Sequence, residues 1–293
     1  MAPRVRVLGA DSFGVRSMAV VVELESGTKV AIDPGVSYAP RRYGLPPHPR
    51  ELERLGEVKE RILREAVDAD YIVLTHYHYD HYIYSPEEVE FYRGKVILAK
   101  HPSANINFSQ RMRAYRLFKK SGVERLAKRI VYIDGSRISV EGATIEGSEP
   151  VPHGPEGSKL GYVVMVRIRG EGVDFVHASD TQGPMSERAL NILIEWKPAL
   201  LFISGPPTYF AGYKVAEEDV ESGLRGLRLL AQSLSSSTII VDHHAARDLA
   251  YPELLKSVSG LGARITSAAD YMGVEYEPLE ALRKRLWEAS AGN

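Results

Sequence analysis

The 293-residue sequence contains no cysteine. This absence excludes disulfide bonds, iron–sulfur clusters and zinc sites with thiolate ligands, and it leaves histidine and carboxylate as the strong metal ligands. The sequence also lacks a long apolar run: the stretch from Met18 to Val22 is far too short to span a bilayer, and no signal-peptide core follows Met1. We therefore expect a soluble, cytoplasmic protein that does not bind membranes.

Excess charge of either sign is absent as well. The 37 Lys and Arg residues nearly balance the 38 Asp and Glu residues, which leaves a net charge of -1. The chain as a whole therefore does not attract nucleic acid, and any such binding must come from a local patch. The length, the ordinary 44% apolar content and the lack of repeats or linkers predict one domain over residues 1–293, with no signal for an oligomeric state.

Three of the nine histidines stand within six residues, directly after a short apolar run that predicts a buried strand at 71–74. In an extended segment, side chains two positions apart point the same way, so His76 and His78 can reach one point. Asp80 and His81 can face a second point nearby. Imidazole and carboxylate together are ligands for zinc or a similar ion, and two adjacent sets suggest a two-metal centre. The alternative is a polar, tyrosine-rich loop, which the spacing of four ligand-type residues disfavours.

Further ligand-type residues follow other apolar strands. Asp33 ends the strand predicted at 29–32, Asp180 ends a strand that begins at Val173, and His153 stands alone after two short strands. His243 and His244 end the strand that begins at Thr238, and because neighbours on a strand point to opposite faces, only one is expected to reach the site. We favour His243, the first residue after the strand. Strand ends of this kind gather at one edge of a sheet, where binding sites lie.

The order of strands and helices predicts an α/β sandwich, because hairpin-like strands come first and strands alternating with helices come later. A helix is expected to begin at Ser85, since Ser-Pro-Glu-Glu has the form of a helix N-terminus. A single strand is expected from Tyr162 to Ile168. The other predicted helices cover residues 50–66, 109–129, 186–196, 216–234, 252–258 and 279–289.

The ordered pattern of a His-x-His-x-Asp-His motif, a lone histidine, an aspartate after a strand and a final histidine resembles the metallo-β-lactamase superfamily. The early stretch from Ser12 to Met18 and the late Asp242-His243-His244 resemble a mainly archaeal branch of it. Asp33-Pro34-Gly35 resembles the first motif of that superfamily. The resemblance covers residues 33–244 and implies an αββα sandwich, with two mixed sheets flanked by helices and metals at the sheet edge. It implies two divalent ions, with zinc expected and manganese or iron as alternatives. The implied ligands are His76, His78 and His153 for the first ion, Asp80, His81 and His243 (or His244) for the second, Asp180 as the bridge, and Asp33 as an orienting residue that does not ligate.

The resemblance implies a hydrolase. Two ions would hold a bridging water and lower its pKa from ~15.7 toward ~7, with Asp80 and Asp180 as catalytic residues. A phosphodiester, RNA included, is the leading substrate, because nucleases are numerous in the superfamily and residues 109–129 are strongly basic. A small ester, thioester or lactone is the alternative.

A function of another class stays open. A non-catalytic metal-binding or sensing protein would need a blocked entrance, which the bulky tyrosines between Tyr77 and Tyr84 could provide. The basic stretch is itself more typical of a solvated helix face, with Met112, Leu117 and Leu126 packed inward.

Several loop residues are candidates for the surroundings of the site. His48, Arg41 and Arg42 lie in a proline-rich loop and are candidates for substrate binding. The segment 205–209 has two consecutive prolines and predicts a rigid turn on the rim of the site. His177 precedes Asp180 by an odd number of residues, so we expect it to face away from the site as a structural histidine.

Overall fold

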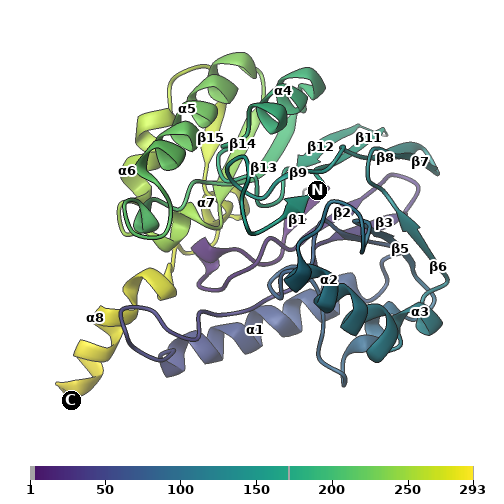
Figure 1. Ribbon diagram of the computed structural model, residues 1–293, viewed down its shortest axis with the longest axis horizontal. Coiled ribbons are helices and arrows are strands. Elements are labelled where there is room, and N and C mark those ends of the chain that lie inside the picture. The colour runs from purple at the N-terminus through teal and green to yellow at the C-terminus, as the bar shows by residue number, and fades with distance from the viewer. Residues whose placement is uncertain (1–3, 171, 293) are drawn as a thin grey trace.

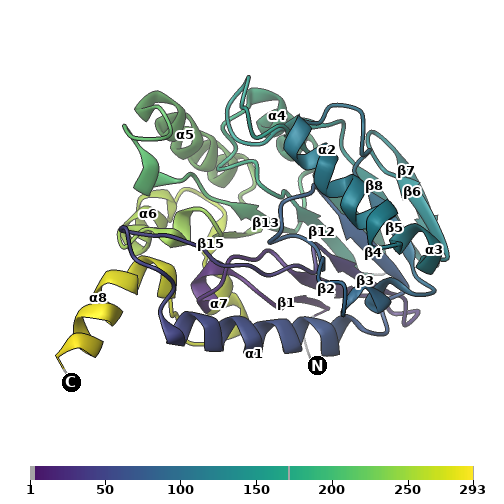
Figure 2. The same cartoon turned by 60° about the horizontal axis from the view of Figure 1, so that its bottom comes forward.

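The computed structural model describes residues 4–170 and 172–292, and two β-sheets pack face to face with helices on both outer sides (Figure 1). A second view shows the same layers from below (Figure 2). This arrangement is the αββα sandwich that the resemblance predicted. Residues 1–3, which belong to the prediction about the N-terminus, lie outside the described residues. No helix within 4–170 or 172–292 is long and apolar enough to cross a membrane.

The first sheet is mixed. Its strands pair antiparallel from β1 to β3 and parallel from β3 to β6. In spatial order they are β1 (Val5–Val7), β2 (Val20–Glu23), β3 (Lys29–Ile32), β4 (Tyr71–Leu74), β5 (Val96–Ala99) and β6 (Arg129–Tyr132).

The second sheet is also mixed, with parallel pairs from β15 to β12 and antiparallel pairs from β12 to β7. In spatial order its strands are β15 (Arg264–Thr266), β14 (Thr238–Asp242), β13 (Leu200–Ser204), β12 (Val173–His177), β11 (Val166–Gly170), β8 (Ala143–Gly147) and β7 (Arg137–Val140). A separate two-stranded ladder joins β9 (Val151–Pro152) to β10 (Tyr162–Val163).

Six helices cover the two outer faces, whereas the buried residues Ala268 and Ala269 of a further short helix belong to the cluster between the sheets. Buried residues of α1, α2 and α3 pack in one apolar cluster with the first sheet, and those of α4, α5 and α6 pack in another with the second sheet. His48 and Glu51 cap the start of α1 reciprocally, and Pro49 occupies its first turn. The helices are α1 (Pro49–Ala66), α2 (Phe108–Tyr115), α3 (Val123–Leu126), α4 (Glu187–Trp196), α5 (Glu217–Ser233), α6 (Tyr251–Val258), α7 (Ala268–Met272) and α8 (Leu279–Ala291).

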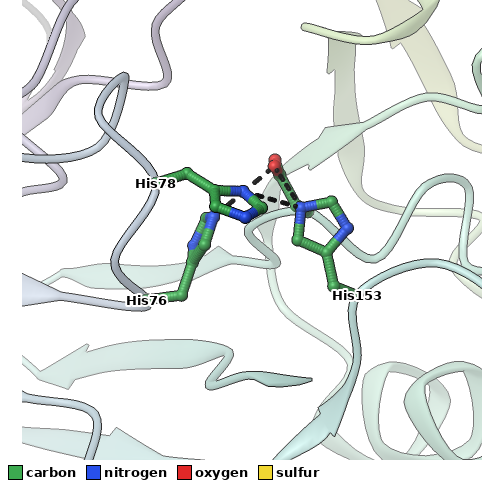
Figure 3. Close-up of side chains that lie close together, drawn as sticks. His76, His78 and His153 are labelled. Atoms are coloured by element: carbon green, nitrogen blue, oxygen red, sulfur yellow. Dashed lines mark hydrogen bonds and ion pairs between the residues drawn. The ribbon is translucent and has the colours of Figure 1, made fainter. Parts of the chain in front are cut away.

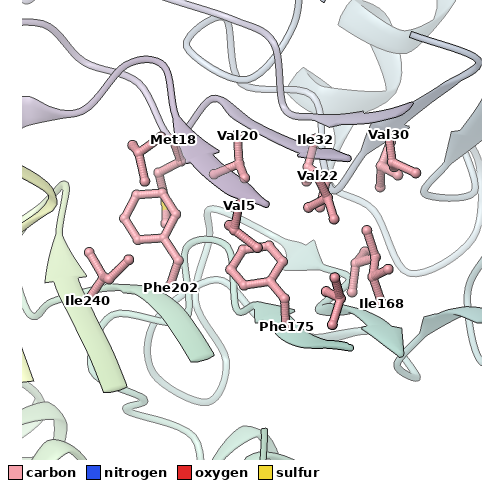
Figure 4. Packing of buried hydrophobic residues seen from close by; sticks show 14 of the residues in the cluster. Val5, Met18, Val20, Val22, Val30, Ile32, Ile168, Phe175, Phe202 and Ile240 are labelled. Carbon is pink, nitrogen blue, oxygen red and sulfur yellow. The ribbon is translucent and has the colours of Figure 1, made fainter. Parts of the chain in front are cut away.

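The core lies between the two sheets. Figure 4 shows side chains of the first sheet, such as Val20 and Ile32, facing Phe175, Phe202 and Ile240 of the second. The alternating inward positions of β2 and β3 supply one side of this layer, as the strand period of two requires. Because burial of such side chains drives folding by about 25 cal/mol per Å² of apolar surface, this layer fixes how the two sheet edges face one another.

Two predicted helices do not form. The predicted helix at 109–129 is broken into α2, a π-helix at Arg116–Lys120, α3 and the start of β6. The interruption follows Ser121, because Gly122 has a left-handed backbone with φ 76° that ends the helical path. After Ser85 a turn leads into a short 3-10 helix at Val89–Tyr92 instead of an α-helix. Gly94 reverses the chain there and β5 begins two residues later, so no room for a longer helix remains.

The predicted strand from Tyr162 to Ile168 is divided. Residues 162–163 pair with β9, whereas Val166 begins β11 in the second sheet. Between them the backbone N–H of Val164 donates to the carbonyl oxygen of Thr75, which immediately follows β4 in the first sheet. The chain therefore links the two sheets at the edge where the histidine cluster emerges. The other five predicted helices are confirmed to within two residues at each end.

Candidate metal centre

Asp180 lies at the centre of the residues that follow the strand ends. Its Oδ2 atom is 2.9 Å from Nε2 of His153, 3.6 Å from Nε2 of His76 and 3.5 Å from Nε2 of His81. Its Oδ1 atom is 3.4 Å from Nε2 of His243. A single buried carboxylate thus contacts histidines from both sheets, at the edge predicted from the sequence.

The first group of potential ligands comprises His76, His78, His153 and Asp180, whose ligand atoms all lie within 4.8 Å of one another. We call it the first position. Figure 3 shows the three histidine rings pointing toward one another, with His76 and His78 on one segment and His153 on another. Nδ1 of His78 is 3.2 Å from Nε2 of His153.

The second group comprises Asp80, His81 and His243, whose ligand atoms also lie within 4.8 Å of one another. We call it the second position, and Asp180 lies between it and the first. Nε2 of His243 is 3.6 Å from Oδ2 of Asp80. His81 and His243 are fully buried, whereas the side chain of Asp80 is 16% exposed.

His243 and His244 both face Asp180, which the alternation of a strand would not allow. His243 has a left-handed backbone with φ 57°, so the chain turns immediately after β14 and both rings point the same way. Nε2 of His244 is 3.4 Å from Oδ2 of Asp180. His243 lies in the group with Asp80 and His81, and His244 is the partly exposed member of the pair, with 14% of its side chain accessible.

The same backbone conformation follows two other strands of the centre. Asp33 has φ 46° just after β3, and Ser179 has φ 51° shortly after β12. Non-glycine residues rarely adopt positive φ, and such conformations gather at functional sites that the surrounding fold holds in place. Tight turns after three strands therefore aim polar side chains at one edge of the sandwich.

Asp33 contacts the segment that carries the histidines, and its ligand atom lies within 4.8 Å of those of His76 and His81. Its Oδ1 accepts a hydrogen bond from the backbone N–H of Thr75 at 2.8 Å, and its Oδ2 accepts one from the hydroxyl of Thr75. The same Oδ2 is 2.8 Å from Nδ1 of His81. With these partners engaged, Asp33 orients Nε2 of His81 toward Asp180, the arrangement of a carboxylate that supports a metal-binding histidine.

Two supporting residues were not found from the sequence. Oδ2 of Asp11 lies 2.7 Å from Nδ1 of His243, and its Oδ1 accepts a hydrogen bond from Nε of Arg247 at 2.7 Å. Arg247 is only 3% exposed, and its Nη2 lies 3.6 Å from Oδ2 of Asp80. Asp11 belongs to a short 3-10 helix at Asp11–Phe13, far from the histidine motifs in the chain, so no local signal identified it.

Asp242, the last residue of β14, has a structural role. Its carboxylate accepts hydrogen bonds from the backbone N–H groups of Ser12, His243 and Ala268 at 3.0, 2.7 and 3.1 Å. It therefore ties the turn that presents the two late histidines to the Asp11 segment and to α7. Burial raises the pKa of this carboxyl group.

The protonation tendencies of the histidines follow their surroundings. Burial lowers the pKa of His78 to about 3, with His153 acting in the same direction. Burial, followed by the charges of His81 and His78, lowers the pKa of His76 well below its ordinary value. Burial also opposes protonation of His81, but the carboxylates of Asp180 and Asp33 outweigh it and raise its pKa well above the ordinary value. The lowered pKa values of His76 and His78 favour the neutral imidazole, which is the form that binds metals.

The donor set fits divalent cations. Nε2 of His76, Nε2 of His81 and Oδ1 of Asp180 are buried and have no hydrogen-bond partner among the described residues. Buried polar atoms are almost always satisfied, so three such atoms directed at one place indicate a missing partner. Imidazole nitrogens and carboxylate oxygens are ligands suited to zinc and comparable ions.

A cleft of about 500 Å³ leads to this centre, and His78, Asp80, His153, Asp180 and His244 line it. Tyr209 is also on its wall, which confirms that the rigid turn at 205–209 borders the site. The positively charged side chains along the cleft are Arg16, Arg41, Arg113, Lys214 and Arg247.

The structure separates the three loop candidates. Arg41 lines the cleft, whereas Arg42 lines a neighbouring groove. His48 is not brought to the cleft: its Nδ1 accepts from Arg50 N–H at the start of α1, and its ring packs edge-on against Trp287. His177 is buried, with Nε2 2.9 Å from the carbonyl oxygen of Met18 and Nδ1 accepting from the backbone N–H of Ser179, so both ring nitrogens have backbone partners, as a structural histidine requires.

Comparison with known proteins finds relatives that match nearly the whole chain. The chain is 47% identical to a UPF0282 protein of Aeropyrum pernix, over 99% of this chain and 100% of that protein. It is 43% identical to a UPF0282 protein of Methanopyrus kandleri, over 97% and 98% of the two chains.

Solved structures share the fold at low sequence identity. A diphosphatase from the PhnP family aligns with a TM-score of 0.52 and 17% identity, over 90% of this chain and 94% of that one. Igni18, a metallo hydrolase from Ignicoccus hospitalis, aligns with a TM-score of 0.50 and 15% identity, over 90% and 93%. The family model for the Metallo-beta-lactamase superfamily matches residues 13–229 of this chain. The chain therefore belongs to the metallo-β-lactamase superfamily.

Proposed function

We propose that the protein is a dinuclear metal-dependent hydrolase that acts on a phosphodiester. The observation that carries the proposal is the position of Asp180 between two groups of ligands, with buried unpaired atoms directed at the same place. The first position would hold one ion through His76, His78 and His153. The second would hold another through Asp80, His81 and His243, with Asp180 shared between them. Zinc suits this donor set, and manganese or iron are alternatives.

When bound, two divalent ions supply a water of lowered pKa and a Lewis acid for the substrate oxygen. The remaining roles fall to the protein. Oδ2 of Asp80 faces both the cleft and the centre, so it is placed to accept a proton as the ester is attacked. Burial opposes ionisation of Asp80, but His81, His243 and Arg247 outweigh it and lower the pKa of this carboxyl group. Nη2 of Arg247 lies 3.6 Å from its Oδ2.

The charges around the cleft favour an anionic substrate. Arg16 is paired with Glu280, and Arg247 with Asp11. The other three cations of the cleft, Arg41, Arg113 and Lys214, have no carboxylate within ion-pair distance among the described residues. Such cations attract a phosphate group and place it by hydrogen bonds.

The basic stretch at 109–129 contributes to the cleft through Arg113 alone. Leu117 is buried there and Leu126 packs partly inward, as expected of a solvated helix face, but Met112 is exposed instead of packed inward. Phe118 is buried and unable to stack on a ligand. The support for a phosphate-containing substrate therefore comes from the walls of the cleft and not from the long basic surface.

The tyrosines after the motif leave the entrance open, which supports an enzyme over a non-catalytic scaffold. Tyr77 and Tyr82 are buried in the core of the first sheet, and Tyr84 lies outside the cleft lining. Tyr79 lines the cleft wall, with the Cζ atom of Arg113 4.6 Å from the centre of its ring. The cleft thus keeps space for a substrate in front of Asp180.

The test is hydrolysis of bis(p-nitrophenyl) phosphate by protein loaded with zinc or manganese. We expect turnover that a chelator removes and that restored metal recovers. Metal content measured on the same samples should be two ions per chain. Protein that holds two ions without cleaving the phosphodiester, yet cleaves a thioester or a lactone, would replace the proposed substrate class with the acyl alternative.

A further inference from the structure

A second groove of about 390 Å³ adjoins the metal cleft and shares Arg16, Arg41, Tyr209, Phe210 and Lys214 with it. Two short segments form its walls: residues 41–44, and residues 208–214. We call it the outer groove. Because the two hollows share wall residues, a chain-like ligand with one end at the metal centre can extend into the outer groove.

The wall at 208–214 is a compact turn held by its own backbone. The carbonyl oxygen of Phe210 accepts hydrogen bonds from the backbone N–H groups of Tyr213, Lys214 and Val215 at 3.0, 3.0 and 3.2 Å. The hydroxyl of Thr208 also donates to the carboxylate of Asp248, which fixes the base of the turn. This rigid turn presents the ring of Tyr213, which is 79% exposed. An aromatic ring so exposed gains little for folding and is available to a ligand.

The opposite wall is a tight hairpin turn. The backbones of Arg42 and Leu45 exchange two hydrogen bonds at 3.1 and 2.9 Å, and Tyr43 and Gly44 between them have φ of 56° and 74°. Tyrosine at positive φ is an outlier for a bulky residue, held here by a hydrogen bond from its hydroxyl to the carbonyl oxygen of Ala281 at 3.2 Å. The ring of Tyr43 is thereby fixed at the groove, with 47% of the residue exposed.

Positive charge and aromatic rings alternate along the outer groove. The Cζ atom of Arg42 lies 4.6 Å from the ring centre of Tyr43 and 4.2 Å from that of Tyr209. Nζ of Lys214 lies 4.7 Å from the ring centre of Phe210. Glu280 is the one acidic residue on the lining among the described residues, and both of its oxygens are engaged by Arg16. The groove is therefore cationic toward solvent.

We propose that the outer groove binds the nucleotides that flank the scissile phosphate of a single-stranded nucleic acid. Exposed rings beside unpaired cations match the two surfaces of such a strand, its base faces and its phosphates. In this arrangement a base stacks on Tyr213, while Arg41 and Lys214 bind phosphates between the groove and the metal cleft. An acidic peptide could form ion pairs with the cations, but it has no planar bases to stack on the exposed aromatic rings. The inference rests on the proposed phosphodiester hydrolysis and names its substrate class.

The test is binding of a short, fluorescently labelled single-stranded oligonucleotide with phosphorothioate linkages, followed by anisotropy on the metal-loaded protein. Tyr213→Ala should weaken binding roughly tenfold, the typical loss for one base–aromatic stack, and Tyr213→Phe should keep the affinity. Tyr115→Ala is the matched control, because Tyr115 is an exposed tyrosine on the basic stretch at 109–129. We expect it to bind as tightly as the unchanged protein.

Salt dependence gives an independent readout. Removing one phosphate-binding cation from a single-strand site lowers the slope of log K against log salt by ~0.7. We expect that decrease for Lys214→Ala, whereas Tyr213→Ala should leave the slope unchanged, because it removes stacking and no charge.

Three outcomes would overturn the inference. These are equal affinity of Tyr213→Ala and the unchanged protein, a larger loss in Tyr115→Ala, or competition by inorganic polyphosphate that matches an unlabelled oligonucleotide of the same charge. The last would mean that charge alone is recognised. Because binding is measured without turnover, these failures are distinct from a failure of the phosphodiesterase assay, which would count against the proposed function itself.

Discussion

The two candidate metal positions share Asp180 but differ in what stands behind their histidines. At the first position the supporting groups are neutral. Nδ1 of His76 is 3.1 Å from the hydroxyl of Thr75 and 3.3 Å from that of Ser179, and Nδ1 of His153 is 3.3 Å from the side-chain amide of Gln182. Hydroxyl and amide groups orient an imidazole without adding charge.

At the second position the supporting groups are carboxylates. Asp33 stands behind His81 and Asp11 stands behind His243, both at 2.7–2.8 Å, and Asp80 adds a third carboxylate that faces the centre. Arg247 offsets part of this charge, since it contacts Asp11 and lies near Asp80.

This difference in supporting groups predicts which of the two positions should bind a cation more tightly. A carboxylate behind a histidine makes that ligand more basic and fixes its orientation, and negative charge nearby adds attraction. We therefore expect the second position to fill first and the first position to exchange its ion more readily. The four predictions that follow test this comparison, from the largest expected effect to the smallest.

Removing the shared ligand should abolish both positions at once. Asp180→Ala takes away the carboxylate that lies between the two groups, so we expect loss of both ions and a fall in phosphodiesterase activity of at least about a thousandfold. Metal analysis and turnover of bis(p-nitrophenyl) phosphate measure this. Asp174→Ala, which removes an ion pair between β12 and Arg167 of β11, is the control and should keep both ions. Two ions retained by Asp180→Ala would refute the bridging role.

Removing a ligand of one position should leave the other occupied. We expect one ion per chain in both His78→Ala and Asp80→Ala, because each side chain belongs to only one group. The remaining ion should be held more tightly in His78→Ala, which keeps the second position. Competition with a chromophoric chelator gives the two dissociation constants. The reverse ranking would mean that Arg247 outweighs the supporting carboxylates.

Neutralising a supporting carboxylate should weaken the second position without destroying it. For Asp11→Asn we expect a loss of roughly 10- to 100-fold in the affinity of one ion, the usual effect of removing a partner of a metal-binding histidine. Ser179→Ala, the matched change behind His76, should cost less, because Thr75 still contacts the same nitrogen. If the two variants lost equal metal affinity, carboxylate and hydroxyl groups behind the histidines would support metal binding equally well.

Replacing Glu280 should change metal binding least, because Glu280 pairs with Arg16 and not with a candidate ligand. Burial opposes its ionisation, but Arg16 outweighs this and lowers the pKa of Glu280 to about 2. The pKa of Glu280 is lower in the folded state than its value of 4.5 in the unfolded chain, so its ionisation stabilises the folded state. This stabilisation is fully present at pH values above 4.5, and it is lost as the pH falls toward 2. At ~1.4 kcal/mol per pKa unit, the contribution at neutral pH is about 3 kcal/mol.

Glu280→Gln tests this assignment through denaturant unfolding at several pH values. We expect the free energy of unfolding of this variant to be about 3 kcal/mol lower than that of the unchanged protein at pH 7, and we expect this difference to shrink as the pH falls below about 5. Metal stoichiometry should stay at two, because Glu280 contacts no ligand. A deficit that is independent of pH would show that packing, and not charge, is the contribution of Glu280.

The local sequence was sufficient for parts of the molecule whose geometry arises within a few residues. The cluster from His76 to His81 could be identified because its four ligand-type residues follow a single strand. The helices with clear caps, such as the one that begins after Ser186, were found for the same reason. The stretch at 109–129 was predicted wrongly because composition and charge favour a helix there, while Ser121 and Gly122 break it.

What the sequence by itself determined is the set of ligand types and the order in which strands deliver them, because hydrophobic alternation and strand ends are local properties. Only the tertiary structure decided that Asp11 supports His243 and Arg247, since Asp11 lies near the N-terminus and far from both residues in the sequence. It also decided that His243 and His244 both face Asp180. That outcome depends on a left-handed turn at φ 57°, a conformation which a residue other than glycine keeps only when the surrounding packing holds it.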